Sequence, residues 1–134
     1  MSIAVDTNVL VRYLTWDDVA QAKAAAAAIE GGEIVAISSI VLCELVWVLK
    51  RAYRLSNTEI ADAMQFVIES RNVDVDRPAA EVGLQMLRRG GDFADGIIWH
   101  DASRARCRHV ATFDRALADL LGADHAVLLG ATQR

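Results

Sequence analysis

The stretch Ile3-Ala4-Val5-Asp6-Thr7-Asn8 decides how the chain is interpreted. A short apolar run ends in Asp-Thr-Asn, and a helical pattern of apolar residues begins at once with Val9. In an open parallel sheet, ligands bind at the carboxyl ends of the strands, so a carboxylate placed just after a buried first strand lies at that edge. Asp6 and Asn8 are also favoured N-cap residues, and capping of the next helix is the simpler interpretation of this stretch taken alone.

Apolar runs and helical patterns alternate along the rest of the chain. Such alternation is typical of an α/β domain with a mainly parallel sheet. A capping box of Ser56 and Glu59 marks one helix start, and Pro78 marks another. The pattern predicts five strands, at residues 3–5, 34–37, 73–76, 109–112 and 126–129, and helices at 9–15, 19–30, 40–53, 57–70, 78–89, 93–106 and 115–121.

The composition predicts one globular domain spanning residues 1–134, with 54% hydrophobic residues and a single proline. No apolar run approaches the roughly 18 residues of a membrane span, and no basic segment precedes an apolar stretch at the N-terminus. Cys43 and Cys107 have neither metal nor redox spacing, so we expect a reduced, cytoplasmic protein. The net charge of −4 argues against broad electrostatic binding of nucleic acid, but not against a nucleic-acid enzyme that uses metal ions.

Three further acidic residues recur at places equivalent to that of Asp6. Glu44 lies among apolar residues in its helix, where a buried charge would have to be paired, protonated or bound to metal; a surface position on a polar stripe is the alternative. Asp95 lies in the first turn of a helix, where Asp92 is better explained as the N-cap. Asp114 follows the fourth predicted strand as Asp6 follows the first, so we expect all four acids to converge at one sheet edge.

Four carboxylates in one pocket would repel one another unless some were protonated or a cation neutralised them. Oxygen ligands select hard cations, so the predicted cofactor is Mg²⁺ or Mn²⁺. A site of this kind suits phosphoryl chemistry with an activated water as nucleophile.

Four segments together resemble the PIN-domain ribonucleases, and most closely the VapC toxins of prokaryotic toxin–antitoxin pairs. They are Val5-Asp6-Thr7-Asn8-Val9-Leu10, Ser38-Ser39-Ile40-Val41-Leu42-Cys43-Glu44-Leu45, Phe93-Ala94-Asp95-Gly96-Ile97-Ile98 and Thr112-Phe113-Asp114. The resemblance implies a three-layer α/β/α sandwich, Mg²⁺- or Mn²⁺-dependent RNA cleavage, a homodimer, and neutralisation by a VapB-type antitoxin. By matching position, it implies a catalytic and metal-binding set of Asp6, Glu44, Asp95 and Asp114, supported by Asn8 and Thr112. Gly96 stands where alanine is more usual.

Other residues receive simpler interpretations. Arg115 is the favoured contact to an RNA phosphate, because arginine matches phosphate oxygens with two donors. Trp47 and Tyr53 are interpreted as core or dimer-surface residues and not as base-stacking platforms. The arginines at 88, 89, 104, 106 and 108 could flank a cleft or lie on solvated faces, and the three histidines lack ligand spacing.

Two other functions stay open at this point. One is a phosphatase of the haloacid dehalogenase type, which also places an Asp after its first strand. That mechanism needs a second Asp two positions later, where this chain has Asn8, and a lysine, of which the chain has only Lys23 and Lys50. The other is a non-catalytic binding module that uses the acidic pocket for regulation.

Overall fold

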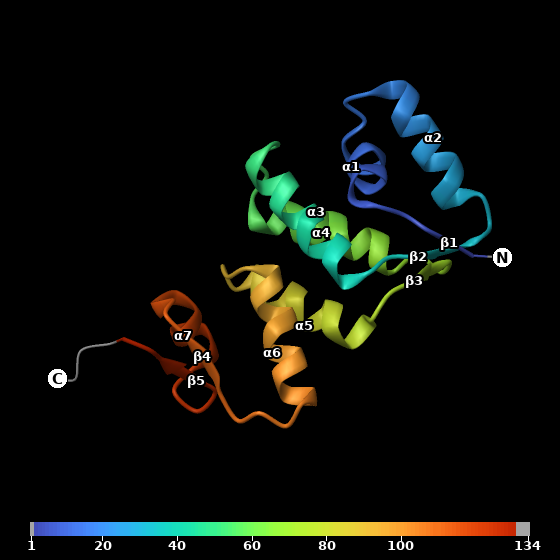
Figure 1. Ribbon diagram of the computed structural model, residues 1–134. Helices are drawn as coiled ribbons and strands as arrows, with labels where there is room; N and C mark the ends of the chain where they lie inside the picture. The colour runs from blue at the N-terminus through green and yellow to red at the C-terminus, as the bar shows by residue number, and fades with distance from the viewer. Residues whose placement is uncertain (1, 131–134) are drawn as a thin grey trace.

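The structure is a computed structural model in which residues 2–130 are described. Three strands, β1 (Ser2–Ala4), β2 (Ile34–Ala36) and β3 (Val73–Asp74), form a parallel sheet in the order β1-β2-β3 (Figure 1). Two more, β4 (Val110–Thr112) and β5 (Ala126–Leu128), form a separate parallel pair. The helices are α1 (Thr7–Thr15), α2 (Val19–Glu30), α3 (Ser39–Arg51), α4 (Asn57–Ile68), α5 (Arg77–Arg88), α6 (Phe93–Arg104) and α7 (Arg115–Leu121).

Short polar side chains fix where each helix begins. The predicted capping box is present, since Ser56 Oγ accepts from the Glu59 amide while the Glu59 carboxylate accepts from the Ser56 amide. The remaining six helices also begin after a residue whose side-chain oxygen accepts a backbone N–H bond. These caps are Asp6, Asp18, Ser38, Asp76, Asp92 and Asp114.

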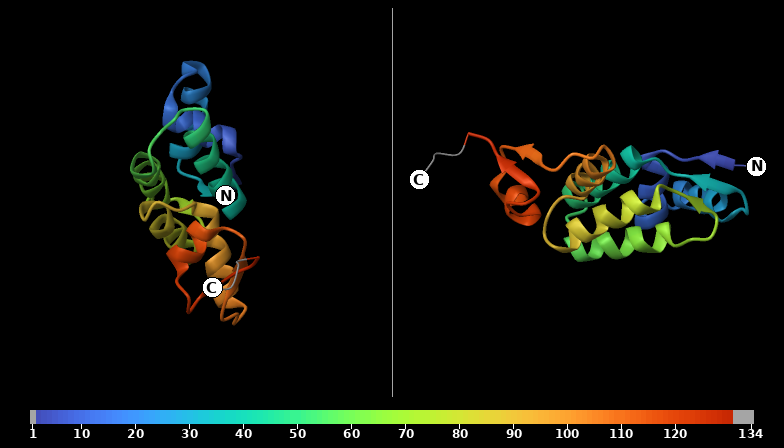
Figure 2. Two further views of the ribbon diagram at one scale, coloured as in Figure 1. Left: turned by 90° about the vertical axis from the view of Figure 1, so that its left-hand side faces the viewer. Right: turned by 90° about the horizontal axis from the view of Figure 1, so that it is seen from below.

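The strands confirm the predicted α/β class and parallel pairing, but the prediction of one five-stranded sheet needs correction. Over residues 2–130, the three-stranded sheet ends at β1 on one side, and β4 pairs only with β5. Arg106, with a φ of 62°, turns the chain after α6. The unit β4-α7-β5 consequently lies at the end of the molecule opposite β1 (Figures 1 and 2). Sequence patterns reveal a strand but not the edge against which it pairs, and this explains the error.

The main core lies between the first sheet and helices α1, α3, α4 and α5. Its fully buried large side chains include Leu45, Leu49, Met64 and Leu87. Burying such side chains is worth about 1.5–3 kcal/mol each, so the core anchors the helices that carry the polar residues described below. Among the described residues, no helix is long and apolar enough to cross a membrane.

Helices α5 and α6 approach each other closely through two glycines. A Cβ atom on Gly96 would lie 2.6 Å from Gly83 Cα and 2.7 Å from the Val82 carbonyl oxygen. A Cβ on Gly83 would lie 2.6 Å from the ring of Phe93, which is itself fully buried. The glycine at 96, where the resemblance favours alanine, therefore allows the contact that holds α6 and its first-turn Asp95 in place.

Candidate active site

The first acidic residue follows β1 and also caps α1. The amide of Val9 donates to Asp6 Oδ1 at 3.1 Å, so the capping interpretation of this residue is correct. Only Oδ1 takes part in this bond, and over the described residues no hydrogen bond engages Oδ2. The exposed carboxylate of Asp6 thus combines a structural bond with an oxygen open to a ligand.

Glu44 lies on α3 and is exposed, contrary to the interpretation that its apolar neighbours bury it. Those neighbours, among them Leu45 and Val46, are buried on the other face of the same helix. The hydroxyl of Thr7 donates to Glu44 Oε1 at 2.8 Å and links the start of α1 to α3. Thr7 is a supporting residue that the sequence interpretation missed, although it lies between Asp6 and Asn8 in the motif.

These residues line a pocket of about 330 Å³ at the start of α1. Its walls are Asp6, Thr7, Asn8, Glu44, Trp47 and Val48. The structure therefore places the predicted supporting residue Asn8 beside two of the four predicted acids.

The other two predicted acids lie in a second pocket, of about 530 Å³. Asp95 and Asp114 line it together with Asp92. Burial raises the pKa of Asp95, and the neighbouring carboxylates of Asp92 and Asp114 raise it further. Charge repulsion of this kind is relieved by a proton or a cation.

Two of the three acids around this pocket also have a structural bond. Asp92 caps α6 by accepting from the Ala94 amide at 3.3 Å, as the sequence predicted. Asp114 caps α7 through Oδ1, which accepts from two backbone amides. Thr112 Oγ1 accepts from the Asp114 amide at 3.0 Å, so Thr112 orients the turn that carries this acid. This hydrogen bond is a physical reason for the predicted supporting role of Thr112.

The four acids therefore form two pairs and do not converge in one pocket, which corrects the sequence-based expectation. Within residues 2–130, no group of three or more His, Cys, Asp or Glu side chains is arranged to hold a metal ion. The cause is the divided sheet, because Asp114 follows β4 and would adjoin Asp6 only if β4 lay beside β1. By chemistry, the donors still fit a hard cation, since all are carboxylate oxygens.

Trp47 lines both pockets and is 58% exposed, so it is not a core residue, and the alternative interpretation as a dimer-surface residue stays a prediction. The guanidinium carbon of Arg51 lies 5.1 Å from the centre of the indole ring. Lys50 and Arg51 both line the second pocket. The sequence analysis did not assign Lys50 and Arg51 to the site, although the i, i+3, i+7 spacing of Glu44, Trp47 and Arg51 places those three residues on one helix face.

The predicted phosphate contact, Arg115, is exposed at the start of α7 next to Asp114, but it does not line either acidic pocket. Two of the other arginines have structural partners. Arg88 forms an ion pair with Asp62 at 3.0 Å, and Arg89 donates to the Leu120 carbonyl at 2.9 Å. The contact between Arg115 and an RNA phosphate stays a prediction.

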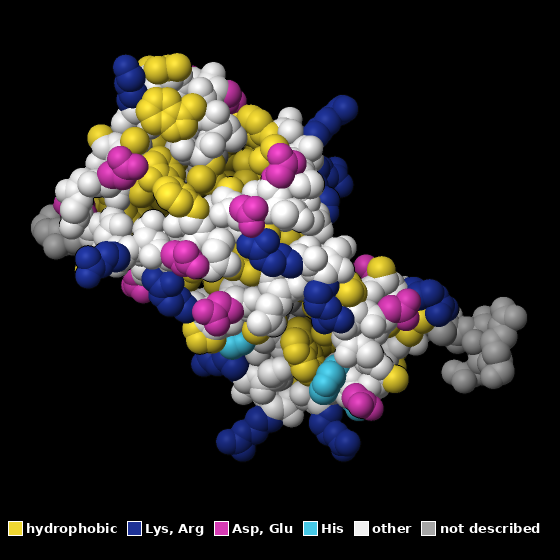
Figure 3. Space-filling view, turned by 180° about the vertical axis from the view of Figure 1, so that it is seen from behind, with side chains coloured by type: hydrophobic (Ala, Val, Ile, Leu, Met, Phe, Trp, Pro, Cys, Tyr) yellow, Lys and Arg dark blue, Asp and Glu magenta, His cyan; other side chains and the backbone are white. Residues whose placement is uncertain are grey.

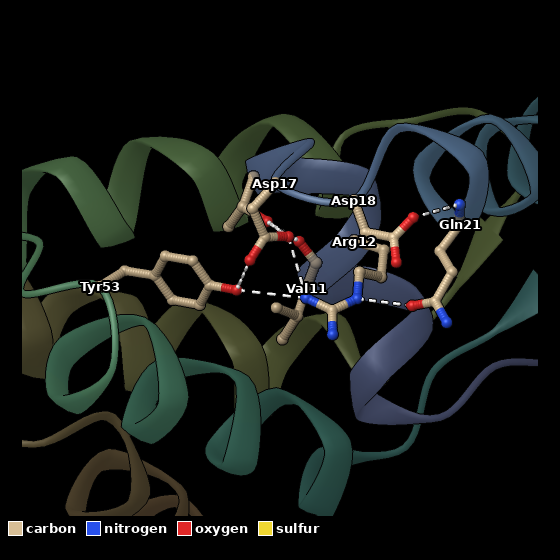
Figure 4. Close-up of polar contacts among 7 residues, drawn as sticks. Val11, Arg12, Asp17, Asp18, Gln21 and Tyr53 are labelled. Atoms are coloured by element: carbon tan, nitrogen blue, oxygen red, sulfur yellow. Dashed lines mark hydrogen bonds and ion pairs between the residues drawn. The ribbon is translucent and has the colours of Figure 1, made fainter.

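A polar network fixes α1, which carries the first acid, against the end of α3 (Figure 4). Arg12 donates to Asp17 at 2.9 Å and to Gln21 at 2.7 Å. The Tyr53 hydroxyl donates to the other carboxylate oxygen of Asp17. This bond, aided by bonds from Thr15 and Arg12, lowers the pKa of Asp17. Tyr53 is thus half-buried and structural.

Comparison with known proteins identifies the family of this chain. A family model described as the PIN domain matches residues 3–121. The chain belongs to the PIN domain family. PIN domains are typically nucleases, and they generally use divalent metals. A comparison with curated proteins found no match. Membership of this family favours a nuclease over the phosphatase and the binding module considered above.

Proposed function

We propose that this PIN domain is a metal-dependent endoribonuclease that hydrolyses RNA phosphodiester bonds with water as nucleophile. The observation that carries the proposal is the placement of Asp6 and Glu44 in one pocket, and of Asp95 and Asp114 in another, with Trp47 in the wall of both. The raised pKa of Asp95 adds support, because burial and repulsion from Asp92 and Asp114 disfavour the carboxylate charge, and a bound cation would offset this cost.

Four acidic residues of this chain would bind the metal ion, and two threonines would position the carboxylates. Asp6, Glu44, Asp95 and Asp114 would hold Mg²⁺ or Mn²⁺ through oxygens not used for capping. When bound, such an ion lowers the pKa of a water and stabilises negative charge on the phosphate. Thr7 fixes the Glu44 carboxylate, and Thr112 fixes the turn of Asp114.

We further propose that the protein is the toxin of a VapBC-type pair, acting as a homodimer and neutralised by a VapB-type antitoxin. The four motif segments quoted above, in family order, support this assignment. Induced expression without an antitoxin should arrest growth of the host cell, and the Asp95→Asn variant at equal abundance should not. Equal growth of cells expressing either form would contradict the toxin role.

Cleavage of an end-labelled pool of structured RNAs tests the nuclease directly. The purified protein would be assayed with Mn²⁺, with Mg²⁺ and with EDTA, beside Asp114→Asn and the matched control Asp119→Asn. Asp119 is an exposed acid on α7 outside both pockets. We expect metal-dependent cutting by wild type and control, and a loss of about 100-fold or more in Asp114→Asn. Cutting in EDTA, or equal loss in both variants, would contradict the proposal.

A further inference from the structure

We infer that Trp47 is the surface on which the RNA substrate stacks an unpaired base, between the two acidic pockets. The inference rests on the proposed function, because it takes the bound polymer to be RNA. Trp47 is the residue that the walls of both acidic pockets share. A strand that reaches carboxylates in each pocket must therefore pass the indole ring.

The exposure of the ring supports a binding role. Trp47 is 58% exposed, whereas Val46 and Leu49 on the same helix are buried in the core. A tryptophan that only stabilised the fold would bury most of its ring, since burial is the source of its contribution. The indole surface is thus available to a ligand at the centre of the candidate site.

The surroundings of the ring suit a nucleotide. Arg51 lies over the ring, at 5.1 Å from its centre, in a cation–π contact that limits rotation of the indole. Lys50, in the wall of the second pocket, donates to Asn57 at 2.7 Å, which fixes the position of its ammonium group. Two cations beside an aromatic surface match the alternation of phosphate and base in a single strand.

The charge of the whole molecule also favours base stacking at Trp47 as a source of RNA affinity. Acidic and basic side chains are interspersed on the face seen in Figure 3, and the net charge is −4. Phosphate attraction spread over the whole surface would therefore be weak. Base stacking gives affinity that does not depend on net charge, and it selects segments whose bases are unpaired. The substrate class is accordingly a loop or single-stranded stretch of RNA.

The test is equilibrium binding of fluorescein-labelled single-stranded RNA of about 12 nucleotides in EDTA, where no metal-dependent cutting occurs. A second probe of equal length would carry three consecutive abasic riboses. The variants are Trp47→Ala, Trp47→Phe and the matched control Trp16→Ala. Trp16 is 45% exposed at the end of α1 and does not line either acidic pocket.

We expect Trp47→Ala to weaken binding by about 5- to 150-fold, the range for loss of one base–aromatic stack, with Trp47→Phe intermediate and Trp16→Ala within about twofold. The abasic probe should bind wild type more weakly than the normal probe, and Trp47→Ala should bind both alike. In a Trp16→Phe/Trp99→Phe background, RNA should quench the fluorescence of the remaining Trp47.

Several results would overturn the inference. The inference is wrong if Trp47→Ala binds the normal probe as tightly as wild type does. It is also wrong if wild type binds the two probes equally tightly, or binds no RNA. Light scattering that shows Trp47→Ala to dissociate a dimer, with affinity lost equally for both probes, would assign Trp47 to a subunit contact. Failure of the nuclease proposal is distinguishable, because it would leave base-dependent binding intact while the cleavage assay stays negative.

Discussion

Asp95 is a residue whose negative charge destabilises the folded protein. Burial and the carboxylates of Asp92 and Asp114 raise its pKa, so the folded protein holds its proton more readily than the unfolded chain does. Above the unfolded-state pKa, near 4, charging Asp95 therefore lowers the free energy of unfolding. Below that pH both states are protonated, and the cost disappears.

Replacing Asp95 by Asn should consequently stabilise the metal-free protein. At pH 7 in EDTA we expect a rise in Tm of about 1–3 °C, small because the side chain is only partly buried and solvent screens its charge. The rise should vanish below about pH 4. Differential scanning calorimetry of wild type and Asp95→Asn across this range provides the measurement, and a lower Tm in the variant at pH 7 would show that the charge is stabilised in the fold.

At the residue scale, the sequence predicted helix caps better than it predicted which side chains are exposed. Asp6 and Asp92 could be recognised as helix caps because capping depends on the few residues that follow them. The exposure of Glu44 and Trp47 could not be read in the same way. Both lie in a helix rich in apolar residues, and the buried face of such a helix depends on where the rest of the core lies.

At the scale of elements, the pair α5 and α6 depends on the absence of a side chain. Gly96→Ala would place a Cβ 2.6 Å from Gly83 Cα, a backbone atom that cannot move aside cheaply. We expect the free energy of unfolding to fall by about 1–3 kcal/mol, more than the gain of about 1 kcal/mol in helix propensity. Urea unfolding would measure this, with the exposed Asp101→Ala on the same helix as control. An unchanged or higher midpoint for Gly96→Ala would contradict the close packing.

The network between α1, its following turn and α3 should depend on pH. The hydrogen bonds of Asp17 lower its pKa, so its contribution to stability is present above the unfolded-state pKa and is lost as pH falls through the lower folded-state value. Tyr53→Phe removes the hydrogen bond that lowers the pKa of Asp17 most. At pH 7 we expect its Tm to fall by about 1–3 °C, with the difference from wild type narrowing below about pH 4. A difference independent of pH would exclude the Asp17 carboxylate as its source.

At the scale of the whole molecule, the unit β4-α7-β5 stands apart from the main core (Figure 2). It adjoins the rest through the bond from Arg89 to the Leu120 carbonyl and through the rings of Trp99 and His125, whose centres are 4.7 Å apart. A two-stranded sheet is marginal by itself. The unit should therefore open more readily than the core helices.

Hydrogen exchange tests this difference. We expect backbone amides in residues 110–128 to exchange at least about tenfold faster than those of α3 and α4, because local opening needs less free energy than global unfolding. Added Mn²⁺ should slow exchange at β4 if Asp114 shares an ion with another acid, since binding stabilises the bound arrangement. Equal protection of the unit and of α3 would contradict its partial independence.

The molecular scale also marks the limit of sequence interpretation. Within residues 2–130, the five strands, the seven helices and the parallel direction of the strands could be predicted, because each depends on local patterns that agree with one another. The division of the sheet could not, because β1 and β4 have the same apolar pattern whether or not they pair. For this reason the four acids could be identified as a set but not placed in space.

The most direct test of whether these acids form one site is a double-mutant cycle in RNA cleavage. Rates would be measured in Mn²⁺ for wild type, Asp6→Asn, Asp114→Asn and the double variant. If the two pockets act as a unit, each single change should abolish most activity, and the double variant should be no slower than the slower single variant. Losses that multiply in the double variant, or full activity in either single variant, would contradict a shared catalytic site.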